Sequence, residues 1–353
     1  MASFRPFSLS SPMTTVMLLL FLLLCTTNSA TAAAVESAAG GDHRLAPGNN
    51  GGCGGFKRMF SFGDSITDAA EGLGLPFLTP FLRAKTPEDF RQGANFAVAG
   101  ATALSQDFFK KMGLDLTIIP PFSLDNSILI VFTLSCVERK EIMSKSLFLM
   151  GEVGGNDYNH PFFQNRSFTN EIKPLVPKVI AKIENAIKVL IDLGAKTIVV
   201  PGNFPIGCVP RYLTMFQSKS SPQDYDEFGC IKWLNDFSVY HNRALKRMLH
   251  QIHHDSTVSI LYGDYYNTAL EITHHPAAYG FKKETALVAC CGDGGPYNSN
   301  SLFGCGGPST NLCTNPSTYI SWDGLHLTEA AYKFVAHHML HGPYAHQPSI
   351  SPK

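Results

Sequence analysis

Residues 60–74 read FSFGDSITDAAEGLG, a strand-like run that passes directly into polar residues. Residues 59–62 have β character, and the turn Gly63-Asp64-Ser65 follows where this strand is predicted to end. A serine at that place could be a nucleophile, because its own N–H would point toward solvent at a helix start and could stabilise an oxyanion. The alternative is that Ser65 is only a helix N-cap, a task for which Thr67 or Asp68 could compete, and a lone GDS tripeptide is weak evidence for catalysis. The tripeptide alone leaves both readings open.

The rest of the chain alternates between predicted strands and helices. Strand patterns occur at 57–62, 146–150, 196–200 and 257–261, and helical patterns at 171–193, 234–253 and 327–340. Such alternation with short connections indicates βαβ units around a parallel sheet. Parallel sheets bind their ligands at the carboxyl ends of the strands. The polar segments that follow strands are therefore site candidates, namely 63–65, 154–157, 201–204 and 263–264.

The composition is that of a globular chain with an export signal. The 353 residues carry no net charge, which gives no electrostatic reason to expect nucleic acid. Arg5, the apolar run 16–25 and the A-x-A-like site 30–32 predict a signal peptide over residues 1–32. The run is well short of the about 20 apolar residues that a membrane anchor requires. Residues 33–55 are rich in glycine and alanine and are predicted to be a flexible leader.

Cysteine usage agrees with export. An even number of cysteines remains after signal cleavage, which favours disulfides. The cysteine spacing does not fit a zinc site, because the sequence contains no CxxC pair. A bridge between Cys208 and Cys230 is plausible, as is one within 290–313, but the connectivity stays open. Asn165 begins the only N-x-S/T sequon and is a predicted glycosylation site. The eight cysteines are Cys53, Cys136, Cys208, Cys230, Cys290, Cys291, Cys305 and Cys313.

Asp323 and His326 lie three residues apart just before the last predicted helix. In a turn, this spacing can place the carboxylate against the imidazole, fix its tautomer and leave the other ring nitrogen to accept a serine proton. The alternative is a helix-start aspartate beside an ordinary surface histidine.

Two glycine-containing segments offer candidate oxyanion donors. Gly100 in GANFAVAGAT (93–102) and Asn156 in GGND (154–157) could donate a backbone N–H and a side-chain amide. Taken separately, each segment is better explained by turn chemistry. Asn95 and Asp157 are expected to be hydrogen-bonding scaffold residues.

In chain order, Ser65, Gly100, Asn156 and the pair Asp323/His326 resemble the four sequence blocks of the GDSL esterase/lipase family, also called SGNH hydrolases. The resemblance covers most of residues 56–345. Four longer segments look like the plant branch of that family: SLFLMGEVGGNDYN (146–159), VVPGNFPIGCVP (199–210), CCGDGGPYN (290–298) and WDGLHLTEAAY (322–332).

The resemblance implies an α/β fold, a three-layer α/β/α sandwich with a flavodoxin-like parallel sheet. It implies Ser65 as nucleophile, His326 as general base and then acid, and Asp323 as the residue that orients His326. The implied oxyanion hole combines the backbone N–H groups of Ser65 and Gly100 with the side chain of Asn156. No metal or organic cofactor is expected.

The expected protein is a secreted, extracellular ester hydrolase of the apoplast or cell wall that acts on small carboxylic esters, acyl or acetyl, through an acyl-enzyme. A single hydrolase domain is predicted over 56–345, followed by a tail over 346–353. We expect a monomer with no nucleic-acid partner and no membrane span after signal cleavage. The alternatives are an impaired relative that binds without catalysis or has no activity, and a glycan acetyl esterase.

Two segments depart from the plant pattern. After Asp68 the family continues for several dozen residues before a stretch like AEGLGLPFLTP, whereas here that stretch follows almost directly. A βαβ crossover needs at least about 10–12 residues including its helix, and residues 66–75 contain Gly72 and Gly74. The helix that should support Ser65 is therefore expected to be short or missing. The second departure is 125–142, where the family would have an amphipathic helix but the run 128–132 is poorly patterned for one.

Overall fold

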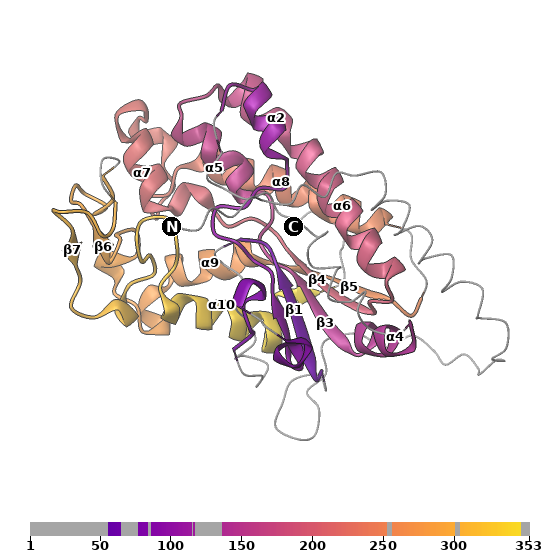
Figure 1. Cartoon of the computed structure of the whole chain (residues 1–353). Coiled ribbons are helices and arrows are strands. Elements are labelled where there is room, and N and C mark those ends of the chain that lie inside the picture. The colour runs from indigo at the N-terminus through magenta and orange to yellow at the C-terminus, as the bar shows by residue number, and fades with distance from the viewer. Residues whose placement is uncertain are drawn as a thin grey trace, which may run out of the picture. The chain divides into compact units, whose positions relative to one another are not determined.

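A parallel sheet forms the centre of the fold (Figure 1). The computed structural model describes residues 56–64, 77–83, 86–114, 116, 136–252, 256–300 and 304–346. The strand order is β2-β1-β3-β4-β5, all parallel, which is the flavodoxin-like order, and β8 joins β5 antiparallel at one edge. The predicted α/β fold class is therefore confirmed. The strands are β1 (Arg58–Phe62), β2 (Gly93–Asn95), β3 (Ser146–Met150), β4 (Thr197–Pro201), β5 (Ser259–Gly263) and β8 (Ala345–His346).

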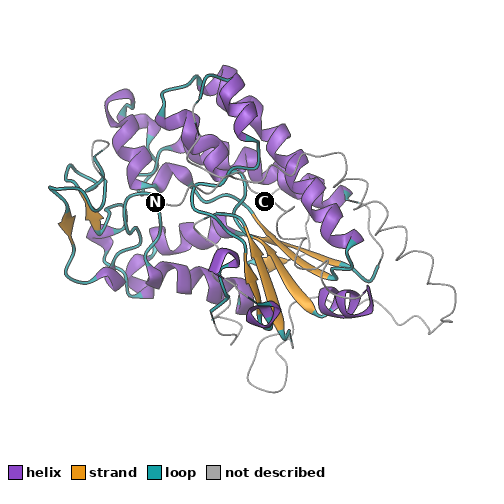
Figure 2. Cartoon of the chain, in the orientation of Figure 1, coloured by secondary structure: helices purple, strands orange, loops and turns teal. Residues whose placement is uncertain are grey.

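Helices cover both faces of the sheet (Figure 2). The strands impose this arrangement because successive side chains point to opposite faces. In β3, Phe148 and Met150 belong to the core under α6 and α8, whereas Leu147 and Leu149 belong to the core under α9 and α10. The α-helices are α2 (Gln106–Lys111), α4 (Cys136–Ser144), α5 (Gly155–Phe163), α6 (Val176–Asp192), α7 (Pro210–Phe216), α8 (Lys232–Gln251), α9 (Tyr265–His274) and α10 (Glu329–His341).

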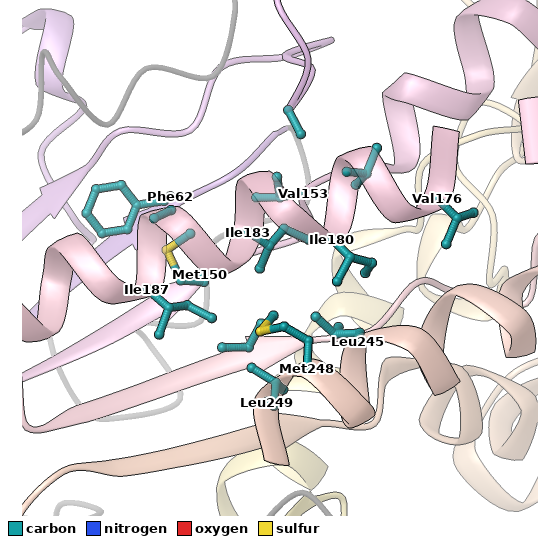
Figure 3. Packing of buried hydrophobic residues seen from close by; sticks show 14 of the residues in the cluster. Phe62, Met150, Val153, Val176, Ile180, Ile183, Ile187, Leu245, Met248 and Leu249 are labelled. Atoms are coloured by element: carbon teal, nitrogen blue, oxygen red, sulfur yellow. The ribbon is translucent and has the colours of Figure 1, made fainter. Parts of the chain in front are cut away.

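The larger core lies between the sheet and the helix pair α6/α8. Figure 3 shows Ile180, Ile183 and Ile187 of α6 close to Leu245 and Met248 of α8. All five side chains are buried, as their helical spacing in the sequence predicts.

Two predicted elements are shifted at their ends. The helical pattern over 171–193 becomes α-helical only at Val176, after one π turn and one 3₁₀ turn, because Pro174 and Pro177 lack the N–H that helix interiors use. Gly194 follows the helix at φ 104°, as a C-terminal glycine should. The strand predicted at 257–261 lies two residues later, where its last residues pair with Val200 and Pro201 of β4.

Short helical turns connect the main elements. They are η2 (Phe81–Arg83), η3 (Pro87–Phe90), η4 (Phe168–Ile172), η5 (Lys173–Leu175), η6 (Ile206–Cys208), η7 (Gln217–Lys219), η8 (Pro222–Asp224), η9 (Pro276–Tyr279), η10 (Lys283–Thr285) and η11 (Pro316–Thr318).

Three disulfides lie within the described residues. Cys208 pairs with Cys230, as predicted. The region 290–313 contains two bridges, Cys290–Cys313 and Cys291–Cys305, one more than the single bridge expected there. The first of these flanks the small antiparallel pair β6 (Cys291–Gly292) and β7 (Asn311–Leu312), and the second links β6 to the loop between the two strands.

Several sequence predictions fall on residues outside the described ones. These are the signal peptide and leader over 1–55, Ser65 with the short segment that follows it, and the apolar run 128–132. Between Phe77 and β2 the described helical turns are η2 and η3, and α4 begins only at Cys136. Among the helices of the described ranges, none is long and apolar enough to span a bilayer.

Candidate active site

Asp323 and His326 are in direct contact in the loop before α10. The Asp323 Oδ2 and His326 Nδ1 atoms lie 2.6 Å apart. The other carboxylate oxygen accepts the N–H groups of Leu325, at 3.0 Å, and of His326, at 2.8 Å. Gly324 adopts φ 90°, and a Cβ there would lie 2.2 Å from Ser299 Oγ, so the turn requires glycine. The loop therefore holds the carboxylate on the imidazole by local hydrogen bonds.

The two groups stabilise each other's charge. The hydrogen bond with Asp323 raises the pKa of His326, against burial, which lowers it, and the charges of Asp323 and Glu152 add to the rise. Burial would raise the pKa of Asp323, but the hydrogen bond and charge of His326 and two backbone N–H donors bring it below its usual value. An imidazole with a stabilised protonated form suits a general base that must hold a proton and return it.

The corner that precedes Ser65 is tightly packed. Gly63 leaves β1 at φ 125°, and a Cβ on it would lie 2.8 Å from the carbonyl oxygen of Glu152. Asp64, the next residue, is buried, and the described segment 56–64 ends there, one residue before Ser65. Only glycine allows the end of β1 to approach the segment after β3 so closely.

The Asn156 amide and the Gly100 turn meet at this corner. Asn156, in the first turn of α5, donates from Nδ2 to Asp64 Oδ2 at 2.8 Å and to the Ala101 carbonyl at 3.2 Å. Gly100 lies at φ 77° in a turn closed by the hydrogen bond from Ala101 N to Val98 O, at 3.0 Å. The predicted amide donor is thus within the protein's own hydrogen-bond network in this structure.

Asn95 and Asp157 are scaffold residues, as expected. Asn95 Oδ1 accepts the N–H of Ala97 at 2.9 Å. The buried Asp157 carboxylate accepts the N–H groups of Ala103 and Leu104 at 2.8 and 2.9 Å, which fastens the segment after the Gly100 turn to α5. Burial raises the pKa of Asp157 to about 7.

A pocket of about 910 Å³, including its open mouth, connects the corner at Asp64 and Asn156 with His326. Asp64, Asn156 and His326 all line it. Its described lining contains no lysine or arginine. The segment 203–210, which follows β4, supplies one apolar wall. A loop after the carboxyl end of a parallel strand is the expected place for a ligand site. Further apolar lining residues are Ala269, Ala286, Ile320, Leu325 and Leu327.

Glu152 is a site residue that the sequence reasoning missed. It lines the same pocket although only 8% of it is exposed, and it lies two residues after the end of β3. Burial raises its pKa to about 7, while the charge of His326 and a hydrogen bond with Asp64 act against the rise. A charged residue directly after the wholly apolar end of a buried strand, LFLM-Gly-Glu, was the available signal.

The chain matches the family model GDSL-like Lipase/Acylhydrolase over residues 59–339. It therefore belongs to this family, and it is a carboxylic ester hydrolase of the GDSL esterase/lipase type. In particular, it is similar to a sinapine esterase of Brassica napus, with 46% identity over 286 residues that cover 78% of this chain and 72% of the relative. It is 45% identical to GDSL esterase/lipase At1g28600 of Arabidopsis thaliana over 285 residues, 79% of this chain and 72% of the relative.

A third relative bears on the predicted short segment. GDSL esterase/lipase At2g27360 of Arabidopsis thaliana is 38% identical over 346 residues, which cover 87% of the relative and 84% of this chain. Since 84% of 353 residues is about 297, many aligned positions of that relative have no counterpart here. The relative thus has more residues in the aligned region than this chain, as expected if the chain lacks several dozen residues of the plant pattern.

Proposed function

We propose that this family member is a secreted serine hydrolase that cleaves small carboxylic esters through an acyl-enzyme, with Ser65 as nucleophile. The observation that carries the proposal is the 2.6 Å contact between Asp323 and His326 at an apolar pocket that Asp64, the neighbour of Ser65, also lines. Nucleophile, base and orienting acid in this relation are the requirement for acyl transfer by serine.

The proposed reaction has two halves. Ser65 Oγ attacks the ester carbonyl carbon while His326 Nε2 takes the hydroxyl proton, and Asp323 stabilises the imidazolium. His326 then returns that proton to the leaving alcohol oxygen as the C–O bond breaks. A water molecule, deprotonated by His326, attacks the acyl-serine ester, and the acid leaves as Ser65 regains its proton.

The oxyanion would be held by the N–H groups of Ser65 and Gly100 and by the Asn156 amide. Of the two Asn156 contacts, the 3.2 Å one to the Ala101 carbonyl is the longer. We propose that this amide hydrogen leaves the Ala101 carbonyl and bonds the oxyanion instead, while the other hydrogen keeps its bond to Asp64. A donor of this kind contributes roughly 2.7–4 kcal/mol to transition-state stabilisation.

The pocket favours a neutral or cationic ester with an apolar acyl group. Its ionisable lining groups include two carboxyls, Asp64 and Glu152, and its described lining has no basic residue other than His326. An anionic acyl group would face like charge there. A test panel should contain p-nitrophenyl esters of increasing chain length, sinapine because one relative is a sinapine esterase, and an acetylated glycan for the acetyl-esterase alternative.

Export is the second part of the proposal. Disulfides persist in oxidising compartments, and three bridges lie within the described residues. We propose cleavage of residues 1–32, an extracellular single-domain monomer over 56–345, and glycosylation of the exposed Asn165.

A second candidate is an impaired relative that binds esters without turning them over. The observation in its favour is the sequence after Asp68, which passes almost directly into AEGLGLPFLTP where the plant pattern of the family has several dozen further residues. The experiment below separates the two candidates.

The proposal is tested by fluorophosphonate labelling and p-nitrophenyl acetate hydrolysis with wild-type protein and a Ser65→Ala variant. We expect wild-type protein to label, and Ser65→Ala to lose labelling and about 10⁶-fold in kcat. Ser256→Ala, at an exposed turn before β5, is the matched control and should behave as wild type. Folded wild-type protein that neither labels nor turns over contradicts catalysis, whereas an active Ser65→Ala contradicts the nucleophile assignment.

A further inference from the structure

Glu152 occupies a position that the backbone is shaped to accommodate. Its Oε1 lies 2.1 Å from where a Cβ on Gly155 would be, so the carboxyl group rests directly against the start of α5. The preceding Gly154 has φ 109°, a conformation that favours glycine. Burying a carboxyl group without partners is unfavourable, so a carboxyl group held in this position is expected to have a specific partner.

The partner of Glu152 is the carboxyl group of Asp64. The two side chains are hydrogen-bonded to each other, and both are more than nine-tenths buried. Two carboxylates have no proton to donate, so a hydrogen bond between two carboxyl groups requires that the pair hold one proton. Glu152 and Asp64 therefore act as one acid with a single shared proton.

The pair is connected to the candidate oxyanion donor. Asp64 Oδ2 accepts the Asn156 amide at 2.8 Å, and the other Asn156 contact is to Ala101. The position of the Asp64 carboxylate therefore decides where the second amide hydrogen of Asn156 points. Repulsion between Glu152 and Asp64 would move the carboxylate on which that amide is anchored.

We propose that Glu152 is a positioning residue for ester hydrolysis: the proton it shares with Asp64 keeps Asp64 against Asn156 and so aims the second amide hydrogen of Asn156, the one that contacts Ala101, at the oxyanion. This inference rests on the proposed function of the site.

The shared proton gives the reaction a dependence on pH. Burial raises the pKa of Glu152 to about 7, so the pair is singly protonated below that pH and doubly charged above it. Activity should therefore fall as pH rises through the pKa of the pair. The rise at lower pH comes from His326, which must be neutral to act as a base. The charge of Glu152 raises the pKa of His326, but where the pair holds its proton it carries one negative charge, and Glu152→Gln leaves that charge on Asp64. The rising limb should therefore stay near its wild-type position in this variant.

Other titratable groups surround Glu152. The pKa of Asp157 is also raised to about 7, so a falling limb in the wild-type protein alone would not identify Glu152. Burial raises the pKa of each neighbouring tyrosine, so these hydroxyls stay neutral in the range of interest; they are Tyr158, Tyr212, Tyr265 and Tyr332. The comparison of wild-type protein with Glu152→Gln isolates the contribution of Glu152.

The test is the pH profile of kcat/KM for wild-type protein, Glu152→Gln and Glu152→Ala. Glutamine keeps the volume and can donate to Asp64 without titrating, so this variant should lose the fall above about pH 7 while its rising limb stays near the wild-type position. Glu152→Ala removes the carboxyl group that bonds Asp64 and should lower kcat about 100-fold with little change in KM. Glu184→Gln on α6, which breaks a surface pair with Lys188, is the matched control and should keep the wild-type profile.

An infrared titration gives a readout that does not depend on turnover. The carbonyl stretch of a protonated carboxyl should disappear with rising pH in wild-type protein, and Glu152→Gln should lack one such band. If Glu152→Gln keeps both the band and the wild-type falling limb, the inference is wrong. If wild-type protein shows a band that Glu152→Gln lacks but does not react with a fluorophosphonate, the carboxyl pair stands and the proposed function fails.

Discussion

The two halves of the site differ in how the chain builds them. The histidine half is local: Asp323 and His326 are three residues apart, and a single turn makes every contact between them. The serine half is assembled from distant segments, since Asp64, Gly100 and Asn156 come from after β1, after β2 and from α5. A local half should tolerate changes elsewhere in the fold, whereas an assembled half should respond to any group that holds its segments together.

Apart from removal of the nucleophile itself, the largest expected effect concerns the local half. Asp323→Asn should lower kcat by about 10⁴-fold, because the amide cannot stabilise the imidazolium and favours the wrong tautomer. Asp323 raises the pKa of His326, so the acidic limb of the pH profile should move to lower pH in this variant. The measurement is the pH dependence of kcat together with urea unfolding. A profile that does not move would mean that the contact between Asp323 and His326 does not act in catalysis.

A smaller effect is expected in the assembled half. Asn156→Ala should lower kcat by about 10²–10³-fold, because it removes one oxyanion donor. KM should change little, since the amide would act mainly in the transition state. Asn159→Ala, one turn further along α5, is a suitable neighbour control because its amide bonds Asn156 Oδ1 without facing Asp64. Equal losses in both variants would assign the effect to the start of α5 rather than to the donor.

The smallest effect on catalysis is expected from the scaffold of the assembled half. Asp157→Asn places an amide donor against one of two backbone N–H groups, those of Ala103 and Leu104, and should destabilise the fold by about 1–3 kcal/mol. We expect less than a tenfold change in kcat at 25 °C. Urea denaturation and kcat measured on the same preparation check both numbers. A large loss of kcat without a loss of stability would place Asp157 in the chemistry instead.

The regular elements were predictable because their patterns are set locally. The buried run at 146–150 and the helical spacing over 234–253 lie within two residues of β3 and α8. The start of α6 was misplaced because two prolines interrupt a pattern whose apolar spacing begins earlier. Glu152 was missed because a glutamate is usually exposed, and its surroundings depend on residues far away in the chain, namely Asp64 and His326.

The sequence by itself determined four strands of the sheet and three long helices, the family blocks, and the three-residue spacing that permits contact between Asp323 and His326. These follow from residues close together in the chain, whose spacing already restricts their geometry. Only the tertiary structure decided that Glu152, Asp64 and Asn156 form one buried network and that the pocket has apolar walls. Parallel strands bring together residues far apart in sequence, and the burial of polar groups there sets pKa values and hydrogen bonds that no local pattern records.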